Sequence, residues 1–386
     1  MTHFIAPGAT LGVMGGGQLG RMFVHAAQRL GYRTAVLDPD PASPAGLIAH
    51  HHLCTDYLDA QGLAQLAQCS AAITTEFENV PAHALVTLAA QRPVAPGAQV
   101  VAICQDRAAE KAHFKRCGIE CAAFALLETP ADLTNLDDAL FPGILKTAQL
   151  GYDGKGQMPV KTRADLAGAW RDLGGVRCVI EQRLDLALEL SIIVARNAQG
   201  EAVHFSAQHN LHRAGILAVT LCPAPQIPAA LEAQAVKAAL RLAQQMQYVG
   251  VLCVEFFVLQ DGRLLANEMA PRPHNSGHAT IDSCDVSQFE LQVRALTGAP
   301  LTAPRQHSPA VLLNLMGDLW FSASESEAPP DWASVLELPG AHLHLYGKTS
   351  PRRGRKMGHL TLTAATAAQA HAKALQAAQR LGIEAF

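Results

Sequence analysis

The chain has 386 residues, of which 49% are apolar and only 16% are charged, below the roughly 25% charged residues typical of soluble domains. Its 30 Lys and Arg nearly balance its 33 Asp and Glu, so the formal net charge is -3 with His neutral. The length exceeds the roughly 250–300 residues that one hydrophobic core supports, and we expect two or three domains. This composition excludes a disordered or fibrous protein, and the near-neutral charge argues against a nucleic-acid partner.

The sequence also gives an indication of the cellular compartment. No basic region followed by an apolar run and a small-residue cleavage site is present in residues 1–20, and no run of 18 apolar residues indicates a membrane span. The nine Cys are odd in number and scattered, without a Cys-x-x-Cys pair. We therefore expect a cytoplasmic protein with reduced thiols and no membrane partner.

The first part of the chain alternates strands and helices. Short apolar runs at 10–14, 34–37 and 71–75 predict strands, and a helical pattern covers 21–30. This alternation is typical of a parallel α/β sheet, and we expect the unit to span residues 1–97.

A glycine-rich loop follows the first predicted strand. Gly15, Gly17 and Gly20 satisfy the G-x-G-x-x-G pattern, and Asp38 ends the next strand. This arrangement matches the dinucleotide-binding fingerprint, in which backbone N–H groups at a helix N-terminus approach a phosphate. The alternative is a tight strand-to-helix turn without a ligand. By itself, the loop favours a nicotinamide-dependent oxidoreductase.

The second part of the chain carries basic residues and another glycine-rich loop. A helix is predicted over 98–118, with Arg107, Lys111 and Lys115 along one face. Lys146 lies on a predicted strand and precedes the glycine-rich loop 151–157. A fixed cation and a loop rich in N–H donors suit phosphoryl transfer, although the loop lacks the Walker A sequence.

A predicted hairpin holds two glutamates. Asp261-Gly262 is a strong signal for a two-residue turn, and in that register Glu255 and Glu268 lie directly opposite each other. Two opposed carboxylates on an apolar strand pair repel each other, and bound Mg²⁺ removes this penalty. The alternative places both glutamates in solvent or beside Arg263 or Arg272.

Five motifs together resemble the N5-carboxyaminoimidazole ribonucleotide synthase family, ATP-grasp enzymes of purine biosynthesis. They lie at residues 15–22, 76–80, 151–157, 209–212 and 267–278. The resemblance implies a mixed α/β and α+β fold with a Rossmann-like parallel α/β domain, an ATP-grasp domain and a small C-terminal domain. We expect these domains at residues 1–97, 98–301 and 302–386, and the resemblance implies a homodimer.

The resemblance also assigns roles to residues of the nucleotide site. It implies that ATP is bound by Arg107, Lys146, Gly151, Tyr152, Asp153, Gly154, Lys155, Gly156, Gln157, Glu181, Gln182, Arg183, Leu184, Glu189, His212, Asn267 and Glu268. The metal, with two Mg²⁺ ions expected, would be held by Glu255 and Glu268. Neither a nicotinamide cofactor nor biotin is expected.

The same resemblance places aminoimidazole ribonucleotide among Gln18, Glu76, Tyr152, Arg272, His274, Asn275, Ser276, Lys348, Arg355 and Lys356. Catalytic roles are implied for Lys146, Arg272 and His274. Many family members have Pro where this chain has Arg353, and we expect a looser basic loop here.

The resemblance implies an ATP-dependent ligase. ATP would phosphorylate bicarbonate to carboxyphosphate, and the exocyclic amine of the ribonucleotide would capture the carbon, with ADP and phosphate as the other products. The alternatives are another ATP-grasp ligase, such as a formate-dependent glycinamide ribonucleotide transformylase or a biotin carboxylase, a nicotinamide oxidoreductase, and an inactive ATP-binding regulator.

Overall fold

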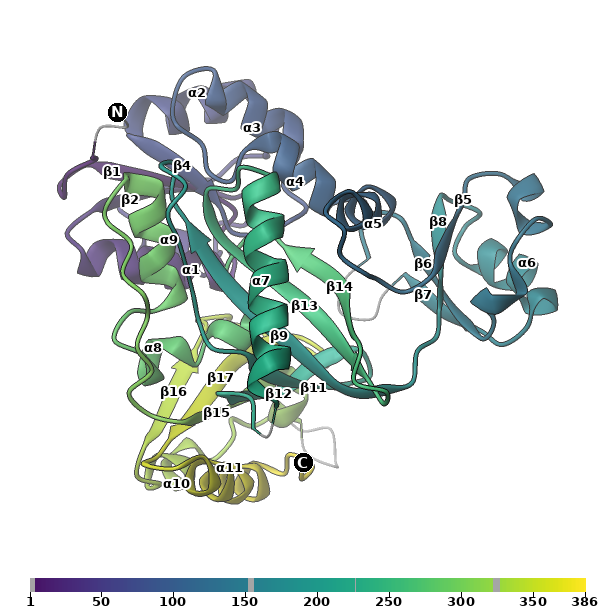
Figure 1. The fold of residues 1–386 in the computed structure, drawn as a ribbon. Coiled ribbons are helices and arrows are strands. Elements are labelled where there is room, and N and C mark those ends of the chain that lie inside the picture. Colours follow the sequence, from purple (N-terminus) through teal and green to yellow (C-terminus); the bar gives the residue numbers. More distant parts are fainter. Residues whose placement is uncertain (1–3, 152–155, 226, 322–326) are drawn as a thin grey trace.

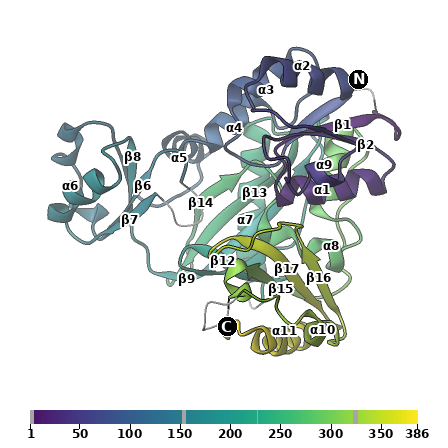
Figure 2. The same cartoon turned by 180° about the vertical axis from the view of Figure 1, so that it is seen from behind.

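The computed structural model describes residues 4–151, 156–225, 227–321 and 327–386. A large body carries a smaller lobe, residues 124–182, that projects from one side (Figures 1 and 2). None of the helices in these stretches has the length and apolar character needed to span a lipid bilayer.

The first unit is a parallel sheet, as the sequence predicts, with strand order β3-β2-β1-β4. Its elements are β1 (Thr10–Met14), β2 (Arg33–Leu37), β3 (His51–Leu53), β4 (Ala72–Thr75), α1 (Gln18–Arg29), α2 (Ala60–Cys69) and α3 (Ala82–Ala89). The strands β1 and β2 are almost entirely buried, because helices cover a parallel sheet on both faces. α1 starts within the glycine-rich loop, earlier than predicted.

The helix predicted over 98–118 is two helices, so that prediction is wrong. α4 (Ala98–Cys104) and α5 (Arg107–Arg116) are separated by a break at Asp106. The Asp106 carboxylate accepts two backbone N–H groups of the first turn of α5, each at 3.0 Å. An Asp at this position favours an N-cap over a continuous helix, since its side chain competes for backbone donors.

The projecting lobe is an antiparallel sheet with order β5-β8-β6-β7. Its elements are β5 (Phe124–Leu127), β6 (Gly143–Thr147), β7 (Gln157–Val160), β8 (Cys178–Gln182) and α6 (Arg163–Asp172). Leu166 and Trp170 of α6 pack on Leu145 and Ile180, so the lobe has its own small core. Lys146 lies on β6, and so on a strand, as the sequence predicts.

The centre of the body is a large antiparallel sheet with α7 on one face and α9 on the other (Figure 1). The central elements are β9 (Leu186–Arg196), β10 (Ala202–His204), β11 (Gln208–Arg213), β12 (Ile216–Cys222), β13 (Gly250–Leu259), β14 (Leu264–Ala270), α7 (Ala229–Gln245), α8 (Thr280–Ser283) and α9 (Gln288–Thr297). Alternate side chains of β9 and β13 enter separate cores beneath the two helices. Burial on both faces explains the apolar runs of these strands.

The last part of the chain continues the same sheet. Its elements are β15 (Ala310–Met316), β16 (Ala341–Leu345), β17 (Lys356–Thr363), α10 (Trp332–Leu336) and α11 (Ala367–Leu381). β15 pairs with β12, which gives the order β14-β13-β9-β11-β12-β15-β17-β16. α11 covers β15 and β17 with buried alanines, including Ala370, Ala374 and Ala377. The sheet therefore crosses the expected domain limit at residue 302.

Candidate active site

The two glutamates of the hairpin lie opposite each other, as predicted from the sequence. β13 and β14 pair antiparallel with Glu255 against Glu268. The turn, however, is a three-residue loop at 260–262, which shifts the neighbouring pairs by one residue. A β-bulge at Asn267 then restores the predicted register. The predicted two-residue turn is wrong, and the predicted pair is right because the two deviations cancel.

The paired carboxylates lie among charged and polar groups. Burial, together with the charge of Glu268, raises the pKa of Glu255 to about 8. Nε2 of His274 lies 3.2 Å from Oε1 of Glu255, and Arg107 donates from Nη1 to Oε2 of Glu268 at 3.2 Å. The hairpin therefore brings together two carboxylates that one cation can neutralise.

Lys146 belongs to a buried ion triad. Its ammonium donates to Oε2 of Glu181 at 3.0 Å, and Nζ of Lys111 lies 3.2 Å from Oε1 of the same carboxylate. Burial would raise the pKa of Glu181, but the two ammonium groups outweigh burial and lower this pKa to about 2. The Lys111 contact was not predicted, although its place on the basic helix face was a signal for it.

The glycine-rich loop ends next to Lys146. The backbone N–H of Thr147 donates to the carbonyl of Gly156 at 2.8 Å, and Gln157 pairs with Lys146 across β6 and β7. Gly156 has a φ of +70°, a conformation that favours glycine. Gly151 begins the loop, and four further predicted ATP-site residues lie outside the described residues: Tyr152, Asp153, Gly154 and Lys155.

The segment that follows Glu181 connects the lobe to the large sheet. Gln182 and Arg183 are held by backbone hydrogen bonds of 2.9 Å, and Leu184 is half-buried. On the large sheet, Nδ1 of His212 lies 3.0 Å from Oε2 of Glu189. Burial lowers the pKa of His212, but the Glu189 carboxylate outweighs burial and raises it. These two predicted ATP-site residues thus form one contact pair.

The backbone N–H groups of the first glycine-rich loop donate hydrogen bonds to side chains of the protein. The N–H of Gly16 donates to Asp38 at 2.7 Å, and those of Gly17 and Gly20 each donate to Glu76 at 3.0 Å. These are the N–H groups that a pyrophosphate would use. The two carboxylates also place negative charge where phosphate would bind. The geometry therefore argues against the nicotinamide interpretation of this loop.

The predicted ribonucleotide residues come together from distant parts of the chain. Lys348 donates from Nζ to Oε1 of Gln18 at 2.8 Å. Arg272 forms a partly buried ion pair with Glu78, which lies two residues after Glu76. Burial would raise the pKa of Glu78, but the Arg272 guanidinium lowers it. Sequence reasoning missed Glu78, although it lies within the quoted motif 76–80.

The hairpin glutamates do not pair with the arginines that were considered as alternatives. Arg272 contacts Glu78, and Arg263 contacts Asp261 at 2.8 Å. Both arginines are therefore engaged with other carboxylates.

The basic loop, residues 348–356, makes contacts within itself and with a neighbouring aromatic ring. Lys348 donates to the carbonyl of Lys356 at 2.6 Å, and Arg355 donates from Nη1 to the carbonyl of Ser350 at 2.8 Å. The guanidinium of Arg353 lies 5.4 Å from the ring centre of Phe321, within the range of a cation–π contact. The residue expected to loosen this loop thus makes a contact of its own.

The motif at 267–278 supplies buried polar side chains. Asn275 is 7% exposed, and Oγ of Ser276 contacts Nδ1 of His274 at 2.9 Å and Oγ of Ser191 at 2.8 Å. Asn210 donates to the same Ser191 oxygen at 3.0 Å. Ser191 was missed because it occupies an apolar strand, and a polar residue in such a run was the available signal.

A second cluster of possible metal ligands lies outside this site. Asp282, His344 and His359 each offer an atom within 4.8 Å of the others. The two imidazole rings, however, stack 4.4 Å apart at 13°, and Nε2 of His344 already contacts Asp282 at 2.9 Å. Because a metal binds in the plane of an imidazole ring, stacked rings do not direct their lone pairs to one ion. We interpret this cluster as structural.

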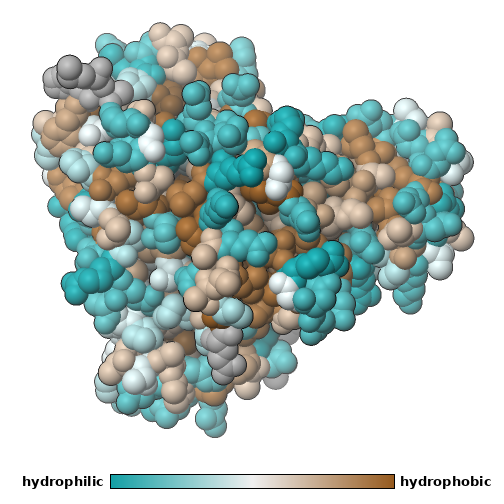
Figure 3. Space-filling view, in the orientation of Figure 1, coloured by the Kyte–Doolittle hydropathy of each residue, from teal (hydrophilic) through white to brown (hydrophobic). Residues whose placement is uncertain are grey.

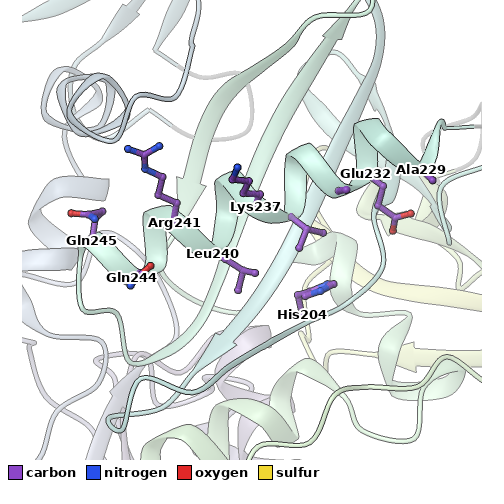
Figure 4. A pocket seen from close by; sticks show the side chains of 10 residues that line it. His204, Ala229, Glu232, Lys237, Leu240, Arg241, Gln244 and Gln245 are labelled. Carbon is purple, nitrogen blue, oxygen red and sulfur yellow. The ribbon is translucent and has the colours of Figure 1, made fainter.

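A groove runs along the outer side of α7 (Figure 4). It has a volume of about 720 Å³, and its lining includes Ala233, Val236 and Leu240 beside charged groups such as Lys237 and Arg241. The space-filling view shows apolar side chains among the hydrophilic ones on this side of the molecule (Figure 3). The groove is thus a partly apolar surface distinct from the carboxylate site.

Three family models match successive parts of the chain. They are the ribonucleotide synthetase preATP-grasp domain at residues 8–105, the ATP-grasp domain at 112–289 and the phosphoribosylaminoimidazole carboxylase C-terminal domain at 310–373. Together with the buried lysine, the glycine-rich loop and the carboxylate hairpin, these matches define an ATP-grasp enzyme.

Relatives and solved structures show to which family of ATP-grasp enzymes the chain belongs. The chain is 38% identical over 360 residues to N5-carboxyaminoimidazole ribonucleotide synthase of Bacillus subtilis, covering 93% of this chain and 92% of the relative. An ADP complex of an N5-carboxyaminoimidazole ribonucleotide synthetase matches with a TM-score of 0.91 and 36% identity over 99% of both chains. The Aspergillus clavatus enzyme in complex with ADP and 5-aminoimidazole ribonucleotide matches with a TM-score of 0.88 and 30% identity, covering 97% of this chain and 99% of that one. The chain belongs to the N5-carboxyaminoimidazole ribonucleotide synthase family.

Proposed function

We propose that the chain uses ATP to carboxylate the exocyclic amine of 5-aminoimidazole ribonucleotide with bicarbonate in purine biosynthesis. ATP phosphorylates bicarbonate to carboxyphosphate with release of ADP. The amine then captures the carbon as a carbamate, and phosphate leaves. The observation that carries this proposal is the opposed pair Glu255 and Glu268, which lies between Arg107 and His274 in a chain of this family.

The nucleotide lies where the lobe meets the large sheet. Arg107 and Lys146 contact the phosphates, residues 151–157 close over them, and residues 181–184 hold the adenine. Glu189 and His212 bind the ribose, which suits their contact of 3.0 Å. Closure of the loop protects carboxyphosphate from water.

Mg²⁺ fits the carboxylate pair, and we propose two ions at Glu255, Glu268 and Asn267. The raised pKa of Glu255 records a buried carboxylate beside another negative charge, a situation that a divalent cation relieves. When bound, the metal neutralises charge on the phosphate oxygens. The protein holds the two carboxylates in register through the β-bulge.

The ribonucleotide lies between the first unit, the parallel sheet and its helices, and the last part of the chain. It contacts Gln18, Glu76, Tyr152, Arg272, His274, Asn275 and Ser276, and its phosphate is bound by Lys348, Arg355 and Lys356. This placement is supported by the hydrogen bond between Lys348 and Gln18. The cationic loop matches a phosphate in charge.

The test is release of ADP with ATP, Mg²⁺, bicarbonate and 5-aminoimidazole ribonucleotide, with each component omitted in turn. We expect turnover only with all four components, together with formation of the carbamate. Release of ADP that is independent of the ribonucleotide contradicts the proposal, and release that depends on formate identifies a different ATP-grasp ligase.

We further propose that the enzyme is cytoplasmic and works as a homodimer. All nine cysteines are free thiols, as is typical of proteins in a reducing compartment. The groove along α7 provides a partly apolar face that a second copy of the chain would cover.

A further inference from the structure

We propose that Glu110 is a positioning residue, which fixes Glu268 through the backbone of Met269, the next residue on β14. Glu110 lies on α5 and is not among the residues that we assign to ATP or metal. Its role in the reaction rests on the proposed function. The hydrogen bond through which it acts is a property of the folded chain alone.

Glu268 lies on a strand that the sheet supports on one side. β14 is the last strand in the order of the large sheet, so that its one neighbour in this order is β13. The β-bulge at Asn267 interrupts this pairing immediately before Glu268. Because a bulge disrupts the hydrogen bonds between strands, the orientation of Glu268 depends on contacts at the outer edge of β14.

Glu110 supplies a contact at this edge. Its Oε1 accepts the backbone N–H of Met269 at 2.5 Å, and the residue is 2% exposed. This N–H belongs to the planar peptide unit that begins at Cα of Glu268, so a bond to it fixes the backbone of Glu268. A carboxylate and a carboxylic acid both accept an N–H, and the contact therefore does not depend on the charge of Glu110.

The same turn of α5 holds Glu268 at a second point. Arg107 lies three residues before Glu110, hence on the same face of the helix, and donates to Oε2 of Glu268 at 3.2 Å. Lys111, the residue after Glu110, lies 3.2 Å from Oε1 of Glu181 in the buried ion triad of the lobe. Loss of the Glu110 contact should therefore let the strand of Glu268 shift relative to the cations of the nucleotide site.

The amide signal of Met269 tests the hydrogen bond directly. The chain has eight methionines, so protein labelled with ¹⁵N in methionine gives few signals, and that of Met269 is assigned by its loss in Met269→Leu. Loss of the acceptor should move this amide proton to higher field in Glu110→Ala and in Glu110→Leu, which fills the space of the carboxyl group and covers the case that Glu110→Ala does not fold. Glu110→Gln keeps an acceptor and should keep the signal near its wild-type position. An unchanged signal in a folded Ala or Leu variant overturns the proposal.

Binding of Mg²⁺ separates a positioning role from a purely structural one. Titration of Mg²⁺ in the presence of ADP, followed by the Met269 signal, gives a midpoint without turnover. We expect this midpoint to rise about 10-fold and kcat to fall about 10-fold in Glu110→Leu, while the KM for the ribonucleotide changes less than about twofold. Glu110→Gln should restore both values to within about twofold of the wild type. A Glu110→Leu chain with a shifted Met269 signal but a wild-type midpoint and kcat overturns the positioning role.

Asp59→Ala is the matched control, because this carboxylate also accepts a backbone N–H, that of Gly62 at 2.6 Å, in the parallel-sheet unit. Its Met269 signal, Mg²⁺ midpoint and kcat should equal those of the wild type, and an equal shift of Met269 in this variant contradicts the proposal. If the Met269 and Mg²⁺ results are as expected but ADP release does not depend on the ribonucleotide, the proposed function fails and the positioning of Glu268 stands.

Discussion

Glu181 shows how one side chain sets the charge balance of the nucleotide region. It is 3% exposed, and its two oxygens face Lys146 and Lys111 at 3.0 and 3.2 Å. Without this carboxylate, two ammonium groups would be buried next to each other. Loss of one partner of a buried ion pair is costly, since the remaining charge has no compensation.

We predict that Glu181→Gln lowers the free energy of unfolding by roughly 3–5 kcal/mol at neutral pH. Because the folded pKa of about 2 is below the ordinary value of 4.5, this carboxylate stabilises the fold above pH 4.5, and its contribution is lost as the pH falls towards 2. Urea unfolding across this range should therefore show a weaker pH dependence in the variant. Glu128→Gln, at an exposed pair with Arg177, is the control. Equal slopes for Glu181→Gln and wild type would refute this prediction.

We predict that Glu255→Gln and Glu268→Gln abolish Mg²⁺-dependent release of ADP but leave the fold intact. Above pH 8, where Glu255 is ionised, the thermal stability of Glu255→Gln should be at least that of the wild type, because a neutral amide removes the repulsion between the two carboxylates. Activity is measured against Mg²⁺ concentration and stability by circular dichroism. Exposed Glu120→Gln should behave as the wild type. Wild-type activity in either site variant removes the proposed metal site.

The sequence was most informative where the relevant contact is local. The facing of Glu255 and Glu268 follows from residues within one hairpin. The ion pair of Arg272 with Glu78 joins residues 194 positions apart. No period or turn signal encodes such a pair, because it depends on how the first unit docks on the large sheet.

The same contrast holds for whole elements. Strands β6 and β8 each contain a short apolar run, and most of their side chains are buried. The break between α4 and α5 depends on one carboxylate, and the bulge in β14 depends on the packing of neighbouring strands. The second glycine-rich loop and the motif at residues 267–278 could be recognised in the sequence. The side chains that these motifs contact could be identified only in the structure.

We predict that Gly262→Ala destabilises the protein by about 1 kcal/mol without loss of activity. Gly262 has a φ of +84° in the hairpin turn, and no other atom lies within 4 Å of an added methyl group. The effect is therefore confined to the backbone. Gly168→Ala, inside α6 and equally uncrowded, should instead stabilise the protein, since alanine favours a helix. Denaturant unfolding compares the two variants, and a neutral Gly262→Ala contradicts the prediction.

At the scale of the whole molecule, we predict that sedimentation velocity shows a dimer and that Leu240→Glu shifts it towards the monomer. Leu240 lies in the groove along α7, where a buried charge opposes association (Figure 4). Val86→Glu, on the exposed side of α3, provides the control because this valine is also an exposed apolar residue. A wild-type chain that sediments as a monomer, or a Leu240→Glu chain that stays dimeric, contradicts the proposal that the dimer interface lies at the groove along α7.

The pairing of β12 with β15 has a consequence for synthesis of the chain. Until residues 310–316 leave the ribosome, β12 is the bare edge of a sheet that is otherwise ready to form. Unpaired strand edges template association with other chains. Lys348, which reaches back to Gln18, emerges later still. A nascent chain can therefore assemble the proposed nucleotide site before the proposed ribonucleotide site is complete, and a stalled or truncated product presents an unpaired strand edge that chaperones and proteases can recognise.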